Sequence, residues 1–204
     1  DDEVAPPSLV GVDFDSAGGT SPANWTLNTA FTTSLTNLSG EDGNATPFDL
    51  EISGFNGADT GNPPASQLPI HSQSLAGIDG NFFANNTVTM TWSDLNPSRE
   101  YEVYVFGLDN FADNQNLTIT GAGAAVGSDG LTLQSFAETI TPTAGGQITI
   151  QVTTSSFLGI GGLAIREVAA STINANLLVT TQGNEAGPID IVYTVSLDQP
   201  NNTG

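Results

Sequence analysis

Apolar and polar residues alternate along most of this chain with a period of two. The clearest run is residues 88–92, in which Val88, Met90 and Trp92 are separated by threonines. Apolar residues do not recur at helical spacing over three turns anywhere in the sequence, so the pattern predicts an all-β protein, a jelly-roll β-sandwich. Further strands are expected at residues 10–14, 31–38, 48–52, 117–120, 131–136, 148–152 and 163–168, which gives about nine or ten in all.

Three segments depart from this alternation. Residues 101–108 are apolar on both faces, which is typical of a central strand. Residues 54–72 are rich in Gly, Asn, Asp and Pro, and we expect a long surface loop there. Residues 1–8 are acidic and contain two adjacent prolines, so they are predicted to form a flexible leader before a jelly roll at residues 9–169.

The last segment, residues 170–204, is predicted to be a strand pair attached to the sandwich. Turn-forming residues occupy 182–188 between two apolar stretches. A two-stranded hairpin is marginal in water, so we expect it to find further strands either in a longer parent chain or, as a donor, in a neighbouring copy of the chain. The apolar residues expected at that inter-subunit strand contact are Ile173, Leu177, Val179, Ile189, Ile191, Tyr193, Val195 and Leu197.

The charge balance narrows the range of partners. The formal net charge is −20, and the only cationic residues besides one histidine are Arg99 and Arg166. Nucleic acid and anionic membranes are attracted by clustered Lys and Arg, so neither is an expected partner. No stretch approaches the roughly 20 apolar residues of a membrane span, and no membrane insertion is expected. The chain has no cysteine, which removes disulfides and thiolate metal sites.

The abundance of acidic and amide side chains favours a divalent cation, since Ca²⁺ prefers oxygen ligands. Residues 109–114 hold a further cluster of Asp and Asn. The alternative is that these residues form solvated acidic turns, and the two readings stay open. The candidate ligands for one structural calcium ion are Asp13, Asp15, Glu41, Asp42 and Asn44.

Covalent glycans are a second possible modification of the surface, because the chain contains six Asn-x-Ser/Thr triplets. Several such triplets arise by chance in a chain so rich in Asn and Thr. The triplet at Asn44 also has an acidic residue two positions upstream, the arrangement that bacterial N-glycosylation favours. The candidate asparagines are Asn24, Asn37, Asn44, Asn85, Asn116 and Asn201.

The sequence contains few residues that indicate catalysis. His71 is the only histidine and lies in the expected loop, and with 22 acidic residues some carboxylate pair is inevitable. The chain is therefore expected not to be an enzyme. For binding of polysaccharide, Trp25 lies in a polar segment and is either a platform for a sugar ring or a buried anchor.

Several short motifs carry a resemblance to known modules. Residues 10–14, 24–26, 94–97, 101–107 and 162–166 resemble secreted bacterial jelly-roll modules, which are similar to galactose-binding-like domains. The resemblance covers about residues 8–168 and implies a jelly-roll fold with a structural calcium in many members. Residues 184–187 and 191–197 resemble the first two strands of a Calx-beta or related immunoglobulin-like repeat.

These observations lead to two functional hypotheses. The first is a structural subunit of a secreted, extracellular or cell-surface bacterial fibre, a head-to-tail homopolymer built by donation of the C-terminal strands. The alternative is a carbohydrate-binding head module of a large multidomain adhesin.

Overall fold

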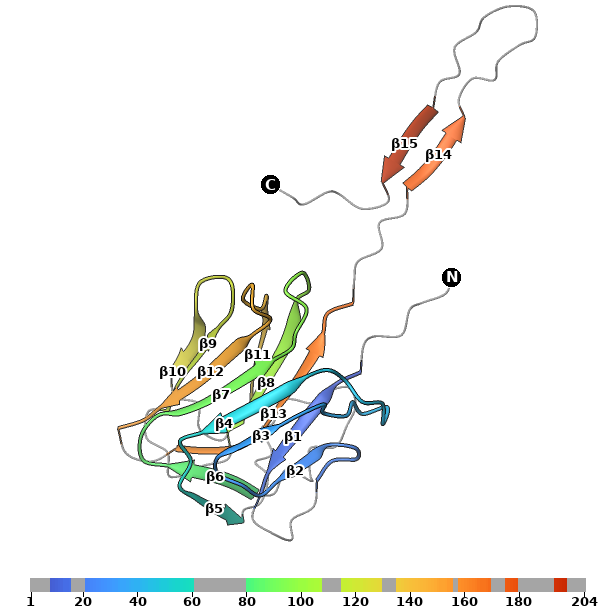
Figure 1. The fold of residues 1–204 in the computed structure, drawn as a ribbon. Coiled ribbons are helices and arrows are strands. Elements are labelled where there is room, and N and C mark those ends of the chain that lie inside the picture. The colour runs from blue at the N-terminus through green and yellow to red at the C-terminus, as the bar shows by residue number, and fades with distance from the viewer. Residues whose placement is uncertain are drawn as a thin grey trace, which may run out of the picture. The chain divides into compact units, whose positions relative to one another are not determined.

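The fold was derived from a computed structural model, which describes residues 8–15, 21–60, 80–107, 115–129, 135–155, 158–169, 175–179 and 193–197. The chain divides into two units, Asp1–Val168 and Ala169–Gly204. All fifteen regular elements within the described ranges are β-strands (Figure 1). The predicted all-β jelly-roll β-sandwich is therefore confirmed. The described part of the chain holds no helix with the length and hydropathy needed to cross a membrane.

One layer of the first unit is a seven-stranded sheet. β6 (Gly80–Ala84) pairs with one of its central strands, and β5 (Gly57–Thr60) pairs with β6. The main path of this sheet runs β11 (Ser135–Ile140), β8 (Tyr101–Gly107), β13 (Leu158–Glu167), β1 (Val10–Phe14), β2 (Thr26–Asn28). β1 is antiparallel to β13 and parallel to β2.

The other layer is a six-stranded sheet in which every pair is antiparallel. Its order is β10 (Val126–Asp129), β9 (Asn116–Thr120), β12 (Ile148–Thr153), β7 (Val88–Ser93), β4 (Asp49–Ser53), β3 (Thr33–Leu35). The two layers face each other in Figure 1.

The core lies between the sheets and follows from the period-two pattern. In β7, Val88, Met90 and Trp92 are fully buried, and the threonines between them are half-buried. Alternate residues of a strand point to opposite faces, so only one face of β7 enters the core. β1 is buried at all five positions, because its second face is also covered, as described below.

The structure corrects several strand predictions. β5 lies inside residues 54–72, the segment that was predicted to be a loop. β13 begins at Leu158, five residues before the predicted start, and β3 is limited to three residues. β8 lies between β11 and β13, which confirms the prediction of a central strand.

The second unit contains a two-stranded antiparallel sheet of β14 (Ala175–Val179) and β15 (Tyr193–Leu197). The register places Leu177 opposite Val195 and Val179 opposite Tyr193. Ile173, Ile189 and Ile191, which belong to the same predicted inter-subunit contact, lie outside the described residues.

Candidate functional site

A small second core covers the outer face of the seven-stranded sheet. The ring of Trp25 is 7% exposed and packs with Leu9, Phe106 and Ala164. Its indole Nε1 donates a hydrogen bond to Glu41 Oε1 at 3.2 Å. The structure therefore places Trp25 as a buried anchor, so the alternative of a sugar platform is corrected: no open face of the ring is left for stacking.

Gly11 explains why this anchor fits. A Cβ atom at Gly11 would lie 2.1 Å from the Trp25 ring, well inside van der Waals contact. The absence of a side chain lets the indole lie directly on β1, which is why β1 is buried on both faces. The motifs at residues 10–14 and 24–26 are thus two halves of one packing arrangement.

Asp13 lies further along the same outer face of β1, and Asp15 is the first residue after this strand. Both residues are fully buried, and the hydroxyl of Ser21 donates a hydrogen bond to Asp13 Oδ2 at 2.7 Å. The backbone N–H of Asp15 continues the parallel pairing with β2 by donating to Asn28 O at 3.2 Å. Burial of two carboxylates at alternate positions is costly unless charge or hydrogen bonds offset it.

The other predicted calcium ligands belong to a separate loop, residues 40–44. Its backbone is joined to the start of β1 by a hydrogen bond from Glu41 N–H to Leu9 O at 2.8 Å. Asn44 donates to Asp42 through its backbone N–H at 3.0 Å and its Nδ2 at 2.9 Å. The side-chain hydrogen bond from Asn44 is the main cause of a lowered pKa for the Asp42 carboxyl.

The structure does not bring the two sets of predicted ligands together. The loop at residues 40–44 is hydrogen-bonded to Leu9, the residue before β1. Leu9 is four residues before Asp13, and four residues of extended chain span about 13 Å. Within the described ranges, no three Asp, Glu or His side chains are grouped closely enough to hold a metal ion. Calcium binding stays a prediction. The Asp13–Asp15 pair and the loop at residues 40–44 are two separate candidate sites for the ion.

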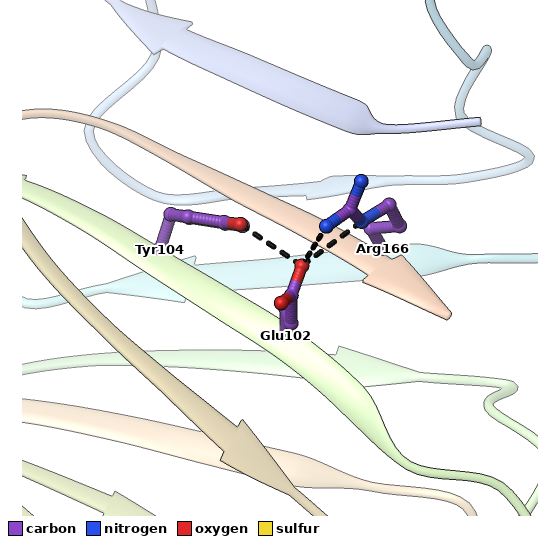
Figure 2. A network of polar contacts seen from close by, with 3 residues as sticks. All are labelled: Glu102, Tyr104 and Arg166. Carbon is purple, nitrogen blue, oxygen red and sulfur yellow. Dashed lines mark hydrogen bonds and ion pairs between the residues drawn. The ribbon is translucent and has the colours of Figure 1, made fainter. Parts of the chain in front are cut away.

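Glu102 gathers a polar network on the outer face of β8 and β13 (Figure 2). Arg166 lies opposite Glu102 in the strand register, and its Nε donates to Glu102 Oε2 at 2.9 Å. The hydroxyl of Tyr104 donates to the same oxygen at 3.0 Å. Burial, followed by the hydrogen bond to Glu102, raises the pKa of the Tyr104 hydroxyl.

The two arginines of the chain are therefore both engaged at the same end of β13. Arg166 pairs with Glu102, and Arg99 Nε lies 3.4 Å from Glu167 Oε1. Both ion pairs lie at residues 166–167, whereas Asp13 is opposite Gly162.

An open cavity of about 310 Å³ lies at one end of the sandwich. Tyr101 is fully buried beside it, and its hydroxyl oxygen accepts the backbone N–H of Asn96 at 2.9 Å. Burial raises the pKa of this hydroxyl. The cavity is lined by Ser8, Ala45, Thr46, Pro47, Phe48, Asp94, Asn96, Tyr101 and Glu167.

Sequence reasoning identified the strands around this cavity but not the cavity itself. One local signal was available: Asp94 follows β7 and has a φ of 58°, a conformation that Asp and Asn adopt more readily than other side chains. This turn directs the following residues across the end of the sandwich. The lone His71 lies outside the described residues.

Five of the six predicted glycan acceptors are described, and their asparagine side chains are all exposed. Asn24 and Asn37 precede buried residues and have positive φ values of 62° and 51°. Asn201 lies outside the described residues.

Comparison with known proteins finds solved structures that are similar to this chain at low identity. No protein-family model matches the chain, and no curated protein matches it at a significant level. The ANX2 ectodomain from Arabidopsis thaliana has a TM-score of 0.47 at 12% identity, over 80% of this chain and 50% of that chain. A Bacteroides uniformis beta-glucuronidase has a TM-score of 0.43 at 11% identity, over 79% of this chain and 18% of that chain.

A third similar structure is the exo-beta-1,3-galactanase from Phanerochaete chrysosporium. It has a TM-score of 0.37 at 12% identity, over 68% of this chain and 30% of that chain. The present chain thus spans half or less of the length of each of these three proteins. The resemblances to galactose-binding-like modules and to Calx-beta repeats stay predictions.

Proposed function

We propose that the chain is a non-catalytic structural module of a secreted bacterial fibre or surface assembly, joined to another copy through its C-terminal hairpin. The observation that carries this proposal is the two-stranded sheet of β14 and β15. Within the described residues, each of these strands has a single neighbour in the sheet. A hairpin of two strands is marginal in water, so strands from another copy would satisfy its backbone groups and bury its apolar residues.

The register of the hairpin supports this role. Leu177 is paired with Val195, and Val179 with Tyr193, so apolar residues stand opposite each other at these two positions. Burying one such side chain contributes about 1.5 to 3 kcal/mol. Because a donated hairpin and the sheet edge that receives it are different surfaces, the contact would repeat head to tail and build a filament.

Electron microscopy of the full chain and of two matched variants tests this function. Val195→Asp places a charge in the apolar register, whereas Asn176→Asp places one opposite Ser196, at a polar position of the same sheet. The wild type and Asn176→Asp are expected to form filaments, and Val195→Asp is expected to stay monomeric. Monodisperse monomers of the wild type at all concentrations would refute strand exchange and favour completion of the sheet within a longer chain.

One structural calcium ion is part of the proposal, at Asp13 and Asp15. The support is that both carboxylates are fully buried two residues apart, and carboxylate oxygens are ligands that Ca²⁺ prefers. Ca²⁺ takes six to eight oxygen ligands, so these two carboxylates would supply only part of its coordination. Chelator should lower the melting temperature of wild type and of Asp42→Asn, but not of Asp13→Asn. A wild-type melting temperature that chelator leaves unchanged would exclude a structural calcium ion.

Binding of carbohydrate is the second candidate, and the end cavity favours it. The cavity combines an apolar wall that includes Phe48 with the polar side chains of Asp94, Asn96 and Glu167, a combination suited to a hydroxylated ring. A glycan array should show hits for neutral sugars that Asn96→Ala weakens and Leu27→Ala, on an edge strand, does not. An array without hits would eliminate this candidate.

A further inference from the structure

The five described Asn-x-Ser/Thr triplets differ in how firmly the fold holds them, although each asparagine is exposed. An oligosaccharyltransferase must reach both the amide nitrogen of the asparagine and the hydroxyl two residues later. A folded chain offers such a segment only where the backbone and both side chains are accessible, as at an exposed turn. The state of the whole triplet therefore decides which asparagine can be modified after folding.

Two triplets are held by hydrogen bonds of their own side chains. Asn24 Nδ2 donates to Glu41 O at 2.6 Å, and the next residue, Trp25, is the buried anchor. Asn44 Nδ2 donates to Asp42 Oδ2 at 2.9 Å, and the hydroxyl of Thr46 donates to Leu38 O at 2.7 Å. In both, the reacting nitrogen is already engaged.

Two further triplets are held by their backbones. The N–H of Asn37 donates to Asp49 Oδ1 at 2.8 Å, and the next residue, Leu38, is 4% exposed and donates its N–H to Phe48 O at 3.0 Å. Asn116 lies in β9, which is paired on one side with β10 and on the other with β12. Freeing this triplet would break two rows of strand pairing.

The triplet Asn85-Asn86-Thr87 is different from the other four. It forms the short connection between β6 and β7, and all three residues are exposed. Among the interactions of the described residues, none involves the side chains of these three residues. We propose that, of the five described triplets, Asn85 is the one that the folded chain offers to an oligosaccharyltransferase that needs only Asn-x-Ser/Thr, with a polyprenyl-pyrophosphate-linked oligosaccharide as the donor of the N-linked glycan.

In the proposed glycosyl transfer, the bond that forms to Asn85 replaces the bond between the sugar and the lipid pyrophosphate. A bond forms between Asn85 Nδ2 and C1 of the first sugar as the bond between C1 and the pyrophosphate oxygen breaks. The amide nitrogen loses one proton to the transferase, and the lipid pyrophosphate leaves with the bonding electron pair. Thr87 supplies the hydroxyl that the transferase recognises in the acceptor triplet.

The location of Asn85 makes this glycan compatible with the other proposed sites. Asn85 precedes β7 and Asp94 follows it, and a strand of six residues spans about 20 Å. The glycan would therefore project from the end of the sandwich opposite the end cavity. The inference does not depend on strand exchange by the hairpin.

The test compares the folded full chain with the chain unfolded in urea and diluted into the reaction. Each is incubated with a lipid-linked oligosaccharide and a single-subunit oligosaccharyltransferase that needs only Asn-x-Ser/Thr, and occupancy is mapped by glycopeptide mass spectrometry. In the folded chain, occupancy of Asn85 should exceed that of the other four by at least about tenfold, which corresponds to about 1.4 kcal/mol of opening free energy. In the unfolded chain this preference should disappear.

Two variants in the same turn complete the test. Asn85→Gln should abolish modification within the described part of the folded chain, whereas Asn86→Gln, which keeps the acceptor triplet, should not. Equal occupancy of Asn24, Asn37, Asn44 or Asn116 in the folded chain would overturn the proposal. So would the absence of sugar on Asn85 in either form.

Discussion

Strands β7 and β15 have the same alternation of apolar and polar residues but different surroundings. β7 is paired with β4 on one side and β12 on the other, and its apolar residues enter a core shared by two sheets. Within the described residues, β15 is paired with β14 alone. Alternation therefore predicts that a segment forms a strand, but it does not predict how many neighbours that strand has. The proposed function of the chain rests on this difference.

The largest expected effect comes from the core that β7 shares. Trp92→Ala should lower the free energy of unfolding of the sandwich by about 3 to 5 kcal/mol, because it leaves a large cavity between the sheets. Val195→Ala in β15 should leave the same transition unchanged within about 0.5 kcal/mol. Urea denaturation of dilute protein, monitored by tryptophan fluorescence in the Val195 variant and circular dichroism in both, measures this contrast.

A second variant of Trp92 separates the effect of lost side-chain volume from the effect of lost polarity. The indole Nε1 of Trp92 has no hydrogen-bond partner among the described residues, so Trp92→Phe removes a buried polar group along with some volume. It should cost clearly less than Trp92→Ala. If Val195→Ala and Trp92→Ala destabilised the sandwich equally, the two regions would not be separate folding units.

The outer face of β1 should give an intermediate effect. Gly11→Ala should cost about 1 to 3 kcal/mol, because the new Cβ atom would overlap the Trp25 ring and force it away. The cost should largely vanish in a Trp25→Ala background, where no ring is present. A double-mutant cycle by thermal denaturation measures this coupling, and additive effects of the two changes would contradict the packing described here.

A smaller, pH-dependent effect is expected from Tyr104. Its folded-state pKa is raised, first by burial and then by the hydrogen bond to Glu102, so the folded state holds the phenolic proton more tightly than the unfolded state. The resulting stabilisation is complete below the ordinary tyrosine pKa of about 10 and is lost as the pH rises through the folded value. Tyr104→Phe should flatten the loss of melting temperature in alkali, whereas Tyr193→Phe in the hairpin should not.

The smallest effect is expected at Asp42, which is fully exposed. The hydrogen bonds from Asn44 lower the pKa of its carboxyl, so its contribution to stability is present above the unfolded pKa and is lost as the pH falls through the folded value. Asn44→Ala should remove this slight acid dependence, as measured by melting temperature between neutral and acidic pH. A large acid shift in Asn44→Ala would point to a different role for the loop.

The sequence was sufficient to predict the fold class because burial on one face of each strand leaves a period-two pattern. Val88, Met90 and Trp92 show this directly. β5 was missed because Gly57 and its neighbours in a glycine-rich segment have no such pattern. This short strand is paired with β6, and Ala58 packs against the main core.

The candidate sites were less predictable, because each depends on contacts between distant segments. The position of Trp25 is decided by Gly11, and nothing local to residues 24–26 distinguishes an anchor from a platform. The end cavity is built by the ends of several strands and includes Ser8 and Glu167, which are far apart in sequence. The acidic composition suggested calcium ligands. Composition could not show that Asp13 lies in β1 whereas Glu41 lies in a separate loop, which is hydrogen-bonded to the chain at Leu9.

Amide hydrogen exchange in β15 tests the central claim most directly. Strand exchange between copies predicts that the amides of residues 193–197 become protected as the protein concentration rises and filaments form, while those of β7 are protected at every concentration. Protection of β15 that is the same in dilute and in concentrated samples, or exchange of β15 that stays fast in filaments, would contradict the proposal that this hairpin joins one copy to the next.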